Sequence, residues 1–578
     1  MEKTILLFGL LANSIFSFSQ TNILSTNNIA EQIMMGNYDP ADYMPTDIIN
    51  GHEEIRQAIQ DGVSADSLHS YLLKLSSFET RNTGSDTISP TAGIGPARRW
   101  VYGQFQKISA ENEGRLIPSY LQFDQNICGM GQHRNVFAVL PGTDPSVPGV
   151  ILIEAHLDSR CKTLCDTGCT AHGMEDNGSG SALVVELARV MSGLAFQRTI
   201  VFMTTIGEEQ GLFGAGAFAQ YAVDKNIGIR AVLNNDIVGG IICGETSSGP
   251  SCPGLNDIDS TQVRLFSQGS FNSRNKQLAR FIKLEYQEEL KDFVPVPMLL
   301  TIMSSEDRSG RGGDHIPFRQ QGFAAMRFTS ANEHGNANAN DPDYHDRQHT
   351  SGDLLGVDTD GDNVIDSFFV DFNYLARNAV INGVAAGMAA IGPVAPGFEA
   401  THYDDVVRVS IDDANDYGEY RVFVRVFSND FDTVFTTTET VFDFPWDVNP
   451  LTAISVASVD GNGIESLFSK EKKPSEASAT GEAKKADKKY IELLPNRPNP
   501  FDEATFISFY VNEIRPYKEA YIRIADMAGR ETKRIPVQLK PGLNEILYEH
   551  GYNQAGTFAY SLVVDGTIMD TKRMIFRG

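Results

Sequence analysis

Basic residues are scarce in this chain, and long hydrophobic runs are almost absent. Its 578 residues include 48 Lys and Arg against 74 Asp and Glu, which gives a net charge of -26. The phosphates of nucleic acids and anionic membranes would repel such a chain, so we expect it to bind neither. After residue 19 no apolar run is long enough to cross a bilayer, so we expect no transmembrane span. No glycine fingerprint opens a helix after the first predicted strand, which argues against a Rossmann-type cofactor site.

Residues 1–19 have the composition of a secretory signal peptide. Lys3 precedes an apolar run over residues 5–12, and small residues stand at Ser17 and Ser19. The run is short for a bilayer, which favours a cleaved signal over a membrane anchor. Residues 20–63 are polar with scattered apolar positions, and we expect an N-terminal extension packed on the main domain.

The six cysteines are Cys128, Cys161, Cys165, Cys169, Cys243 and Cys252. An even number in an exported protein favours disulfides. Cys243 and Cys252 flank a loop rich in Pro and Gly, and we predict that they pair. The others allow one bond within the 161–169 loop and one to Cys128, but the sequence leaves this pairing open. A zinc site made of these thiols is the alternative, and oxidation outside the cell argues against it.

Short apolar runs alternate with a helical pattern between residues 149 and 240. Residues 150–154, 199–205 and 231–233 are apolar and rich in β-branched side chains, which predicts buried strands. Residues 179–191 have apolar side chains at helical spacing. Such alternation predicts an α/β fold with a mixed, mainly parallel sheet flanked by helices. The carboxyl ends of its strands would form the ligand crevice.

Motifs made of carboxylates and one histidine occur at the ends of these apolar segments. They are Ala155-His156-Leu157-Asp158, Glu175-Asp176-Asn177-Gly178, Gly207-Glu208-Glu209-Gln210 and Asn235-Asp236-Ile237. We expect the side chains of these motifs to converge, with no basic residue between them. Carboxylates gathered in this way repel each other unless a cation binds. Imidazole together with carboxylate favours zinc or a similar divalent ion. A further ligand is needed, and His349 in Gln348-His349-Thr350-Ser351-Gly352-Asp353 offers it.

These motifs, in this order over residues 64–392, resemble the cocatalytic two-zinc exopeptidase family that includes the secreted bacterial leucine aminopeptidases. The resemblance implies an aminopeptidase with two zinc ions per chain. It implies that Asp176 bridges the two ions, that His156 and Asp236 complete one site, and that Glu209 and His349 complete the other. It also implies that Glu208 is the general base and that Asp158 orients His156. Two cations would acidify a bridging water and polarise the scissile carbonyl, and Glu208 would carry the proton to the leaving amine.

Other activities on the same fold remain open. A carboxypeptidase would need a cation such as Arg311 aimed at the C-terminal carboxylate of its substrate. A glutaminyl cyclase, also a relative of this family, would use one zinc and no hydrolytic water. An inactive surface-binding scaffold, a different class of protein, would not depend on Glu208.

The later motifs depart from the family pattern. The family has Tyr-His-Thr where Gln348 precedes His349 here, so either Tyr344 reaches the oxyanion from further away or another group stabilises it. His345 competes with His349 as a ligand, and we prefer His349 because it alone precedes Thr350 and Asp353. In the run around Asp314 and His315 we expect support of the site rather than metal binding.

Asp358, Asp360, Asp362 and Asp366 alternate with other residues around a glycine. This pattern resembles the calcium loops of extracellular repeats, although the glycine is misplaced for an EF-hand. Calcium binding is one prediction, and a solvated acidic loop is the alternative.

The C-terminal third changes to alternating strand patterns. Residues 393–468 resemble a fibronectin type III sandwich, a module that spaces or binds. Residues 469–489 are rich in Lys, Ala, Glu and Ser and predict a flexible linker. Residues 490–578, with their Asn-Pro-Phe start and basic end, are similar to the C-terminal sorting domain of type IX secretion in Bacteroidetes. That resemblance implies the type IX machinery as a partner and a secreted or surface-attached product.

Overall fold

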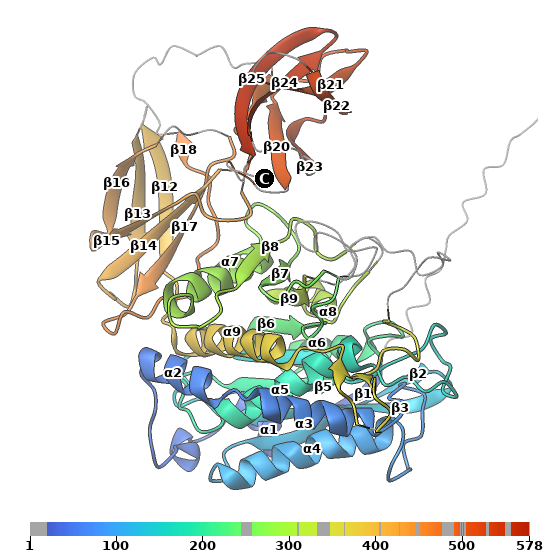
Figure 1. Cartoon of the computed structure of the whole chain (residues 1–578). Coiled ribbons are helices and arrows are strands. Elements are labelled where there is room, and N and C mark those ends of the chain that lie inside the picture. Colours follow the sequence, from blue (N-terminus) through green and yellow to red (C-terminus); the bar gives the residue numbers. More distant parts are fainter. Residues whose placement is uncertain are drawn as a thin grey trace, which may run out of the picture.

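The computed structural model describes residues 20–576 apart from several gaps (Figure 1). The residues outside the description are 1–19, 244–256, 309–310, 332–346, 363, 404–405, 427, 447, 449, 477–490, 498, 500, 502–503, 527–530, 550–555 and 577–578. The predicted signal peptide, Cys252 and Tyr344 therefore lie outside the described residues. No helix in the described part is both long and apolar enough to cross a membrane.

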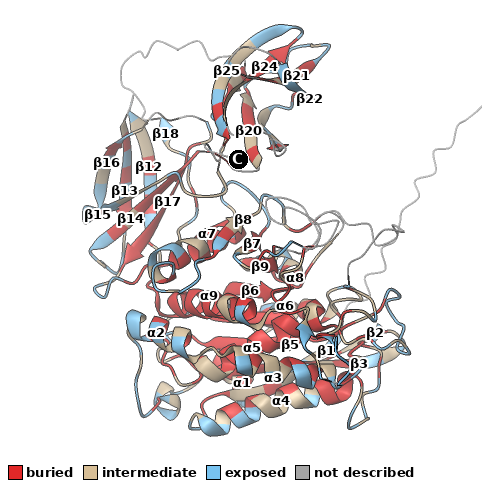
Figure 2. Cartoon of the chain, viewed as in Figure 1, coloured by how far each residue is buried: buried red, intermediate tan, exposed pale blue. Residues whose placement is uncertain are grey.

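A nine-stranded sheet in the order β1-β2-β3-β5-β4-β6-β9-β7-β8 forms the centre of the first part of the chain. Its strands are β1 (Thr21–Ser25), β2 (Ile117–Ile127), β3 (Met130–Leu140), β4 (Val150–His156), β5 (Ile200–Thr205), β6 (Ile229–Asn235), β7 (Gln262–Phe266), β8 (Leu299–Ile302) and β9 (Ala325–Ser330). Every residue of β4 and β5 is buried, as their continuous apolar runs predict (Figure 2).

The prediction of a mixed sheet is confirmed, but that of a mainly parallel one is wrong. The pairs β4–β5, β4–β6, β6–β9 and β7–β8 are parallel. The pairs β1–β2, β2–β3, β3–β5 and β7–β9 are antiparallel. The pair β2–β3 is antiparallel because its strands are joined by a tight turn at Cys128 and Gly129, both with positive φ. A turn this short cannot make the crossover that parallel pairing requires.

The helices of this part are α1 (Asn28–Met34), α2 (His52–Gly62), α3 (Ala65–Ser76), α4 (Ile94–Glu111), α5 (Ser179–Met191), α6 (Phe213–Asp224), α7 (Arg274–Glu285), α8 (His315–Gln320) and α9 (Phe372–Ile391). Helix α5 has the predicted bounds and packs on β4 and β5, while α9 packs on β4, β6 and α5. Ser64 caps α3 by accepting a hydrogen bond from the Ser67 N–H, as expected for an N-cap serine. The predicted N-terminal extension supplies β1 to the sheet edge and buries Ile33, Ile55 and Ile59 in the main core.

A second part has two sheets that share a separate apolar core. One sheet has the order β16-β13-β12-β18 and the other β15-β14-β17. The strands are β12 (Gly397–Tyr403), β13 (Val406–Asp412), β14 (Glu419–Arg425), β15 (Thr433–Thr437), β16 (Val441–Pro445), β17 (Ala453–Val459) and β18 (Ser475–Glu476). Its assignment to the fibronectin type III class stays a prediction.

The start of the predicted linker is packed rather than flexible. Glu471 is buried, and its carboxylate contacts Arg280 of α7 at 3.0 Å and Arg425 of β14. β18 then pairs with β12. The two arginines neutralise Glu471, which permits burial of a charged residue that composition alone places in solvent. Residues 471–476 therefore belong to the packed part of the chain.

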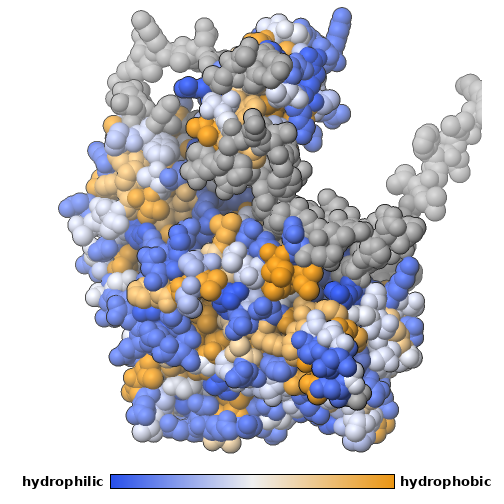
Figure 3. All heavy atoms as spheres, viewed as in Figure 1, coloured by the Kyte–Doolittle hydropathy of each residue, from blue (hydrophilic) through white to orange (hydrophobic). Residues whose placement is uncertain are grey.

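The last part also has two sheets around its own core. One contains β19 (Ile491–Leu493), β20 (Ala504–Val511) and β23 (Gly542–Glu549), and the other contains β21 (Ala520–Asp526), β22 (Glu531–Pro536), β24 (Gly556–Val564) and β25 (Thr567–Phe576). Its identification as a sorting domain stays a prediction. On the face drawn in Figure 3, hydrophilic and hydrophobic residues are interspersed over the α/β part.

Candidate metal centre

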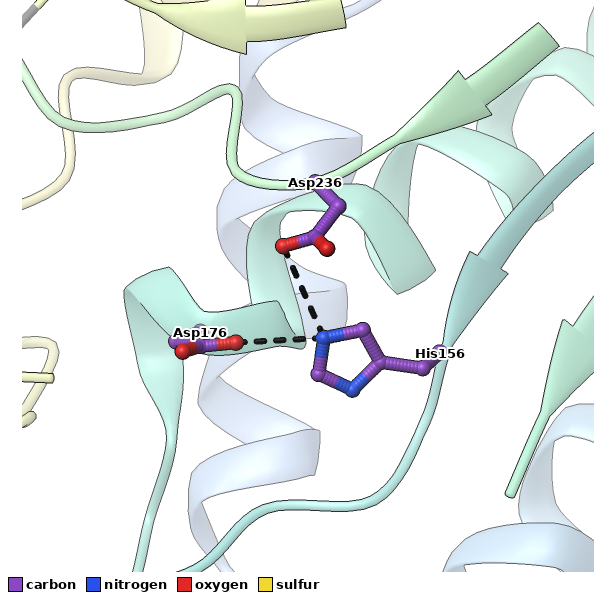
Figure 4. Close-up of side chains that lie close together, drawn as sticks. All are labelled: His156, Asp176 and Asp236. Atoms are coloured by element: carbon purple, nitrogen blue, oxygen red, sulfur yellow. Dashed lines mark ion pairs between the residues drawn. The ribbon is translucent and has the colours of Figure 1, made fainter. Parts of the chain in front are cut away.

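The candidate site lies where three adjacent parallel strands end. β4 ends at His156, β5 ends three residues before Glu208, and β6 ends one residue before Asp236. Because β5, β4 and β6 are neighbours and parallel, their carboxyl ends meet at one edge of the sheet. Asp176 reaches the same edge from the segment that precedes α5, as Figure 4 shows.

Asp176 is the shared member of two groups of side chains. Its Oδ1 lies 3.1 Å from Nε2 of His156, and its Oδ2 lies 3.1 Å from Nε2 of His349. His156 Nε2 is also 3.6 Å from Oδ1 of Asp236, and His349 Nε2 is 3.2 Å from Oε2 of Glu209. Each group thus brings one imidazole nitrogen and two carboxylates within reach of a single ion. This donor set fits zinc, and the structure brings all five predicted ligands together.

The histidines and carboxylates of this centre shift one another's pKa values. Burial alone would lower the pKa of His156, but the carboxylates of Glu208 and Asp236 outweigh burial and raise it well above its usual range. Burial alone would raise the pKa of Asp176, but hydrogen bonds with His156 and His349 hold it well below its usual range. Burial raises the pKa of Glu208 well above that of an exposed glutamate. The geometry therefore favours bound positive charge among these carboxylates.

The segment that carries Asp176 is held by Asp353, a role that sequence reasoning missed. Oδ1 of Asp353 accepts a hydrogen bond from the Glu175 N–H at 2.9 Å, and Oδ2 accepts one from the Asp176 N–H at 3.0 Å. Asp353 lies only four residues after His349, so the same segment supplies a ligand and a support. The proximity of the two residues in the sequence was the available signal.

Asp158 contacts His156 as expected, but through its backbone. Its carbonyl oxygen lies 3.0 Å from Nδ1 of His156, whereas its carboxylate is 3.7 Å from the same atom. The carboxylate instead accepts the N–H groups of Glu208 and Glu209, each at 3.3 Å, and the Thr83 hydroxyl at 3.1 Å. Asp158 therefore fixes the Glu-Glu segment as well as the tautomer of His156.

The prediction that no basic residue lies between the ligands is wrong. Arg160 Nε lies 2.6 Å from Oε2 of Glu209, and Arg327 Nη2 lies 3.3 Å from Oδ1 of Asp236. Arg327 comes from β9, which is far away in the sequence but adjacent to β6 in the sheet. Arg160 follows His156 by four residues, and its proximity was the signal that the motif analysis overlooked.

A cavity of about 370 Å³ opens onto these side chains. It is lined by the five ligands, Glu208, Gln210, Gly211, Leu212, Gly312, Gln348 and the arginines Arg160, Arg308, Arg311 and Arg327. Nη1 of Arg311, the predicted carboxylate receptor, lies 3.4 Å from Nδ1 of His349. Tyr344 and His345 lie outside the described residues.

Asp314 and His315 are fully buried beside this centre. The Asp314 carboxylate accepts a hydrogen bond from the Thr205 hydroxyl at the end of β5. His315 Nε2 contacts the carbonyl oxygen of Glu306 at 3.1 Å. Neither residue belongs to the metal-binding groups found in the described part of the chain, in line with a supporting role.

The predicted calcium residues lie on an exposed loop between β10 (Gly356–Val357) and β11 (Ser367–Phe368). Asp358, Asp360 and Asp366 approach closely enough to share an ion, but Asp362 does not join them. Several of their carboxylate oxygens accept backbone N–H groups of the same loop, which the solvated-loop alternative also explains. Calcium binding stays a prediction.

Two disulfides brace the loop between His156 and Asp176. Cys128 pairs with Cys165, and Cys161 pairs with Cys169. One bond within the loop and one to Cys128 is the arrangement that the sequence allowed without fixing. Cys243 is also disulfide-bonded, while Cys252, its predicted partner, lies outside the described residues.

Comparisons with known proteins give the family. Residues 135–250 match the model of peptidase family M28, a segment that contains every predicted ligand except His349. A probable zinc metalloprotease of Leptosphaeria maculans is 32% identical over 342 residues, which cover 57% of this chain and 75% of that protein. Another, of Pyrenophora tritici-repentis, is 31% identical over 359 residues, or 60% of this chain and 78% of the relative.

Solved structures with a similar arrangement are more distant in sequence. The LapA aminopeptidase of Legionella pneumophila is 19% identical, with a TM-score of 0.40 over 59% of this chain and 76% of that one. The glutaminyl cyclase of Porphyromonas gingivalis is 17% identical, with a TM-score of 0.36 over 56% of this chain and 98% of that one. The assignment rests on the family model and the curated relatives: the chain belongs to peptidase family M28 and is a zinc metallopeptidase.

Proposed function

We propose that this chain is an exported aminopeptidase that binds two zinc ions and removes N-terminal residues from peptides. The observation that carries the proposal is the pair of ligand groups that share Asp176, with Glu208 in the wall of the same cavity. His156 and Asp236 would hold one ion with Asp176, and Glu209 and His349 would hold the other. A single-zinc cyclase would need only one of these groups.

Glu208 is the proposed general base. When bound, zinc supplies Lewis acidity that polarises the scissile carbonyl and makes water more acidic. The Glu208 carboxylate accepts the proton of the attacking water and donates it to the nitrogen of the leaving amine. Its main-chain N–H is fixed by Asp158, which keeps Glu208 beside the ligand groups while Glu209 points to His349.

Charge in the cavity supports recognition of a free α-amine. Four carboxylates and four arginines line the cavity. Arg160 contacts Glu209, Arg308 contacts Asp307, and Arg327 contacts Asp236 and Asp307. The two sets of lining charges are equal in number, but Arg308 and Arg327 also pair with Asp307 outside the lining, so a protonated substrate amine would still meet carboxylate oxygens in the cavity.

A carboxypeptidase is the second candidate, and Arg311 is the observation that favours it. Its guanidinium lines the cavity, and its Nη1 lies 3.4 Å from Nδ1 of His349. A forked guanidinium there suits the C-terminal carboxylate of a peptide.

The deciding experiment compares three forms of one short reporter peptide: free, N-acetylated and C-amidated, each with and without a chelator. An aminopeptidase cleaves the free and C-amidated forms, and chelator abolishes both cleavages. A carboxypeptidase cleaves the free and N-acetylated forms. Failure to cleave any form, with two zinc ions still bound, would contradict both candidates and favour an inactive scaffold.

We also propose that residues 490–578 direct export through the type IX machinery and are then removed, so that the product is released or attached to the cell surface. The Asn-Pro-Phe start and the basic end support this assignment. Deletion of this part in a bacterium with that machinery should retain the enzyme in the periplasm. Normal export of the truncated chain would contradict the assignment.

A further inference from the structure

The two ligand histidines have opposite surroundings at Nδ1. For His156, Nδ1 faces the carbonyl oxygen of Asp158 at 3.0 Å. For His349, Nδ1 faces two guanidinium groups, Nη2 of Arg160 at 2.8 Å and Nη1 of Arg311 at 3.4 Å. Among the described residues, no hydrogen-bond acceptor contacts this nitrogen.

This difference matters for metal binding. A neutral imidazole that binds a metal through Nε2 carries its remaining proton on Nδ1. Metal-binding histidines normally donate this N–H to a carboxylate, a carbonyl or water. His156 already has such a partner, but the N–H of a metal-bound His349 would point at a donor. The contact between Arg160 and His349 is therefore incompatible with a metal-bound neutral His349.

Arg160 also neutralises the other ligand of the same group. Its Nε lies 2.6 Å from Oε2 of Glu209, the oxygen that lies 3.2 Å from Nε2 of His349. The guanidinium thus contacts both ligands that are unique to this group and supplies positive charge there. A metal ion must compete with this charge for Glu209.

Arg160 is more exposed than its counterpart in the other group, Arg327. The side chain of Arg160 is 15% exposed at the rim of the cavity, and its Nη1 already lies 3.3 Å from the carbonyl oxygens of Cys161 and Lys162. Arg327, beside Asp236, is 2% exposed and is fixed by Asp307 at 2.8 Å and the Gly312 carbonyl at 2.9 Å. Arg327 makes no contact with His156 in the described structure, so it leaves that ligand free for a metal.

We propose that the Arg160 guanidinium competes with the metal ion for Glu209 and His349 at the Asp176–Glu209–His349 site. This site binds its metal more weakly than the Asp176–His156–Asp236 site, and metal entry moves the Arg160 guanidinium away from Glu209 and His349. The inference rests on the proposed two-metal centre. It assigns Arg160 a role in setting metal occupancy rather than in the chemical step.

The test is a zinc titration of the full-length, metal-free protein against a chromophoric chelator, with bound zinc counted by native mass spectrometry. The wild type should bind two zinc ions in two separated steps, and His349→Ala should lose the weaker one. Removal of one unit charge next to a dication should tighten that step roughly tenfold or more in Arg160→Gln and leave the tighter step nearly unchanged. Lys162→Gln is the matched control, because it removes one exposed positive charge from the same loop, and it should titrate like the wild type.

Two equal steps in the wild type, or a weaker step that Arg160→Gln leaves unchanged or weakens further, would overturn the role of Arg160 alone. A wild type that binds fewer than two zinc ions would overturn the two-metal centre as well. The thermal midpoint of Arg160→Gln should match that of the wild type. If that variant does not fold, Arg160→Lys, which keeps the charge without the planar fork, should give an intermediate affinity for the weaker step, and an unchanged value would count against the proposal.

Discussion

Replacement of Asp353 by Asn should weaken metal binding at both groups, although Asp353 is not itself a proposed ligand. The two carboxylate oxygens of Asp353 accept the N–H groups of Glu175 and Asp176 at 2.9 and 3.0 Å. An Asn side chain keeps one acceptor oxygen but presents an NH₂ group to the second N–H. The segment that carries the shared ligand Asp176 would lose one charge-assisted hydrogen bond and gain a contact between two donors.

The size of the effect follows from these contacts. A hydrogen bond to a charged group contributes about 1.5–3 kcal/mol. A loss of about 2 kcal/mol corresponds to roughly thirtyfold in metal affinity. This lies within the range of roughly 10- to 100-fold measured when residues that support metal ligands are replaced. Because Asp176 belongs to both groups, both zinc-binding steps should weaken together.

A second effect of the same substitution should appear in stability. Arg81 is fully buried, burial lowers its pKa to about 10, and the negative charge of Asp353 is the largest of the influences that favour its charged form. Loss of that charge makes the buried guanidinium of Arg81 more costly, so the thermal midpoint of the metal-free Asp353→Asn protein should fall.

The assay is a zinc titration of Asp353→Asn and wild type at a temperature well below both thermal midpoints, followed by kcat/KM on the reporter. Asp86→Asn is the matched control, because Oδ1 of the exposed Asp86 also accepts two backbone N–H groups, those of Ile88 and Ser89, away from the site. The control should bind zinc like the wild type. If Asp353→Asn also binds both ions with wild-type affinity, the reasoning about this support is refuted.

Other predictions test the remaining parts of the argument. Glu208→Gln should keep both zinc ions and lower kcat by roughly 10²- to 10⁴-fold, the typical contribution of a general base, and near-normal turnover would contradict its role. His349→Ala should lower the zinc content by one ion per chain, as measured by metal analysis, and an unchanged content would point to another ligand. Burial lowers the pKa of Lys276 to about 7, so between about pH 7 and pH 10 the unfolded chain holds more protons and stability should rise with pH. Lys276→Met should therefore raise the thermal midpoint more at pH 6 than at pH 9, and equal shifts would refute the burial argument. Calcium should raise the thermal midpoint of the wild type but not that of Asp360→Asn, and no effect on the wild type would favour a solvated acidic loop.

The sequence by itself determined the local elements and most of the proposed ligands. Apolar runs of strand length set β4 and β5, and helical spacing set the bounds of α5. These signals depend on neighbours within a few residues, so they can be read without knowledge of the fold. Because ligand motifs follow buried parallel strands, their convergence at one sheet edge follows from the topology of α/β folds.

The tertiary structure decided which charges meet. Arg327 approaches Asp236 because β9 pairs with β6, and the contact between these two residues joins positions 91 residues apart in the chain. The burial of Glu471 depends on arginines from α7 and β14, so a segment with the composition of a linker became part of a packed interface. Only the folded chain showed that Asp353 holds the Asp176 segment and that Arg160 contacts His349. Local composition cannot report such contacts, because they depend on strand order and loop path, which are fixed by the packing of segments distant in sequence.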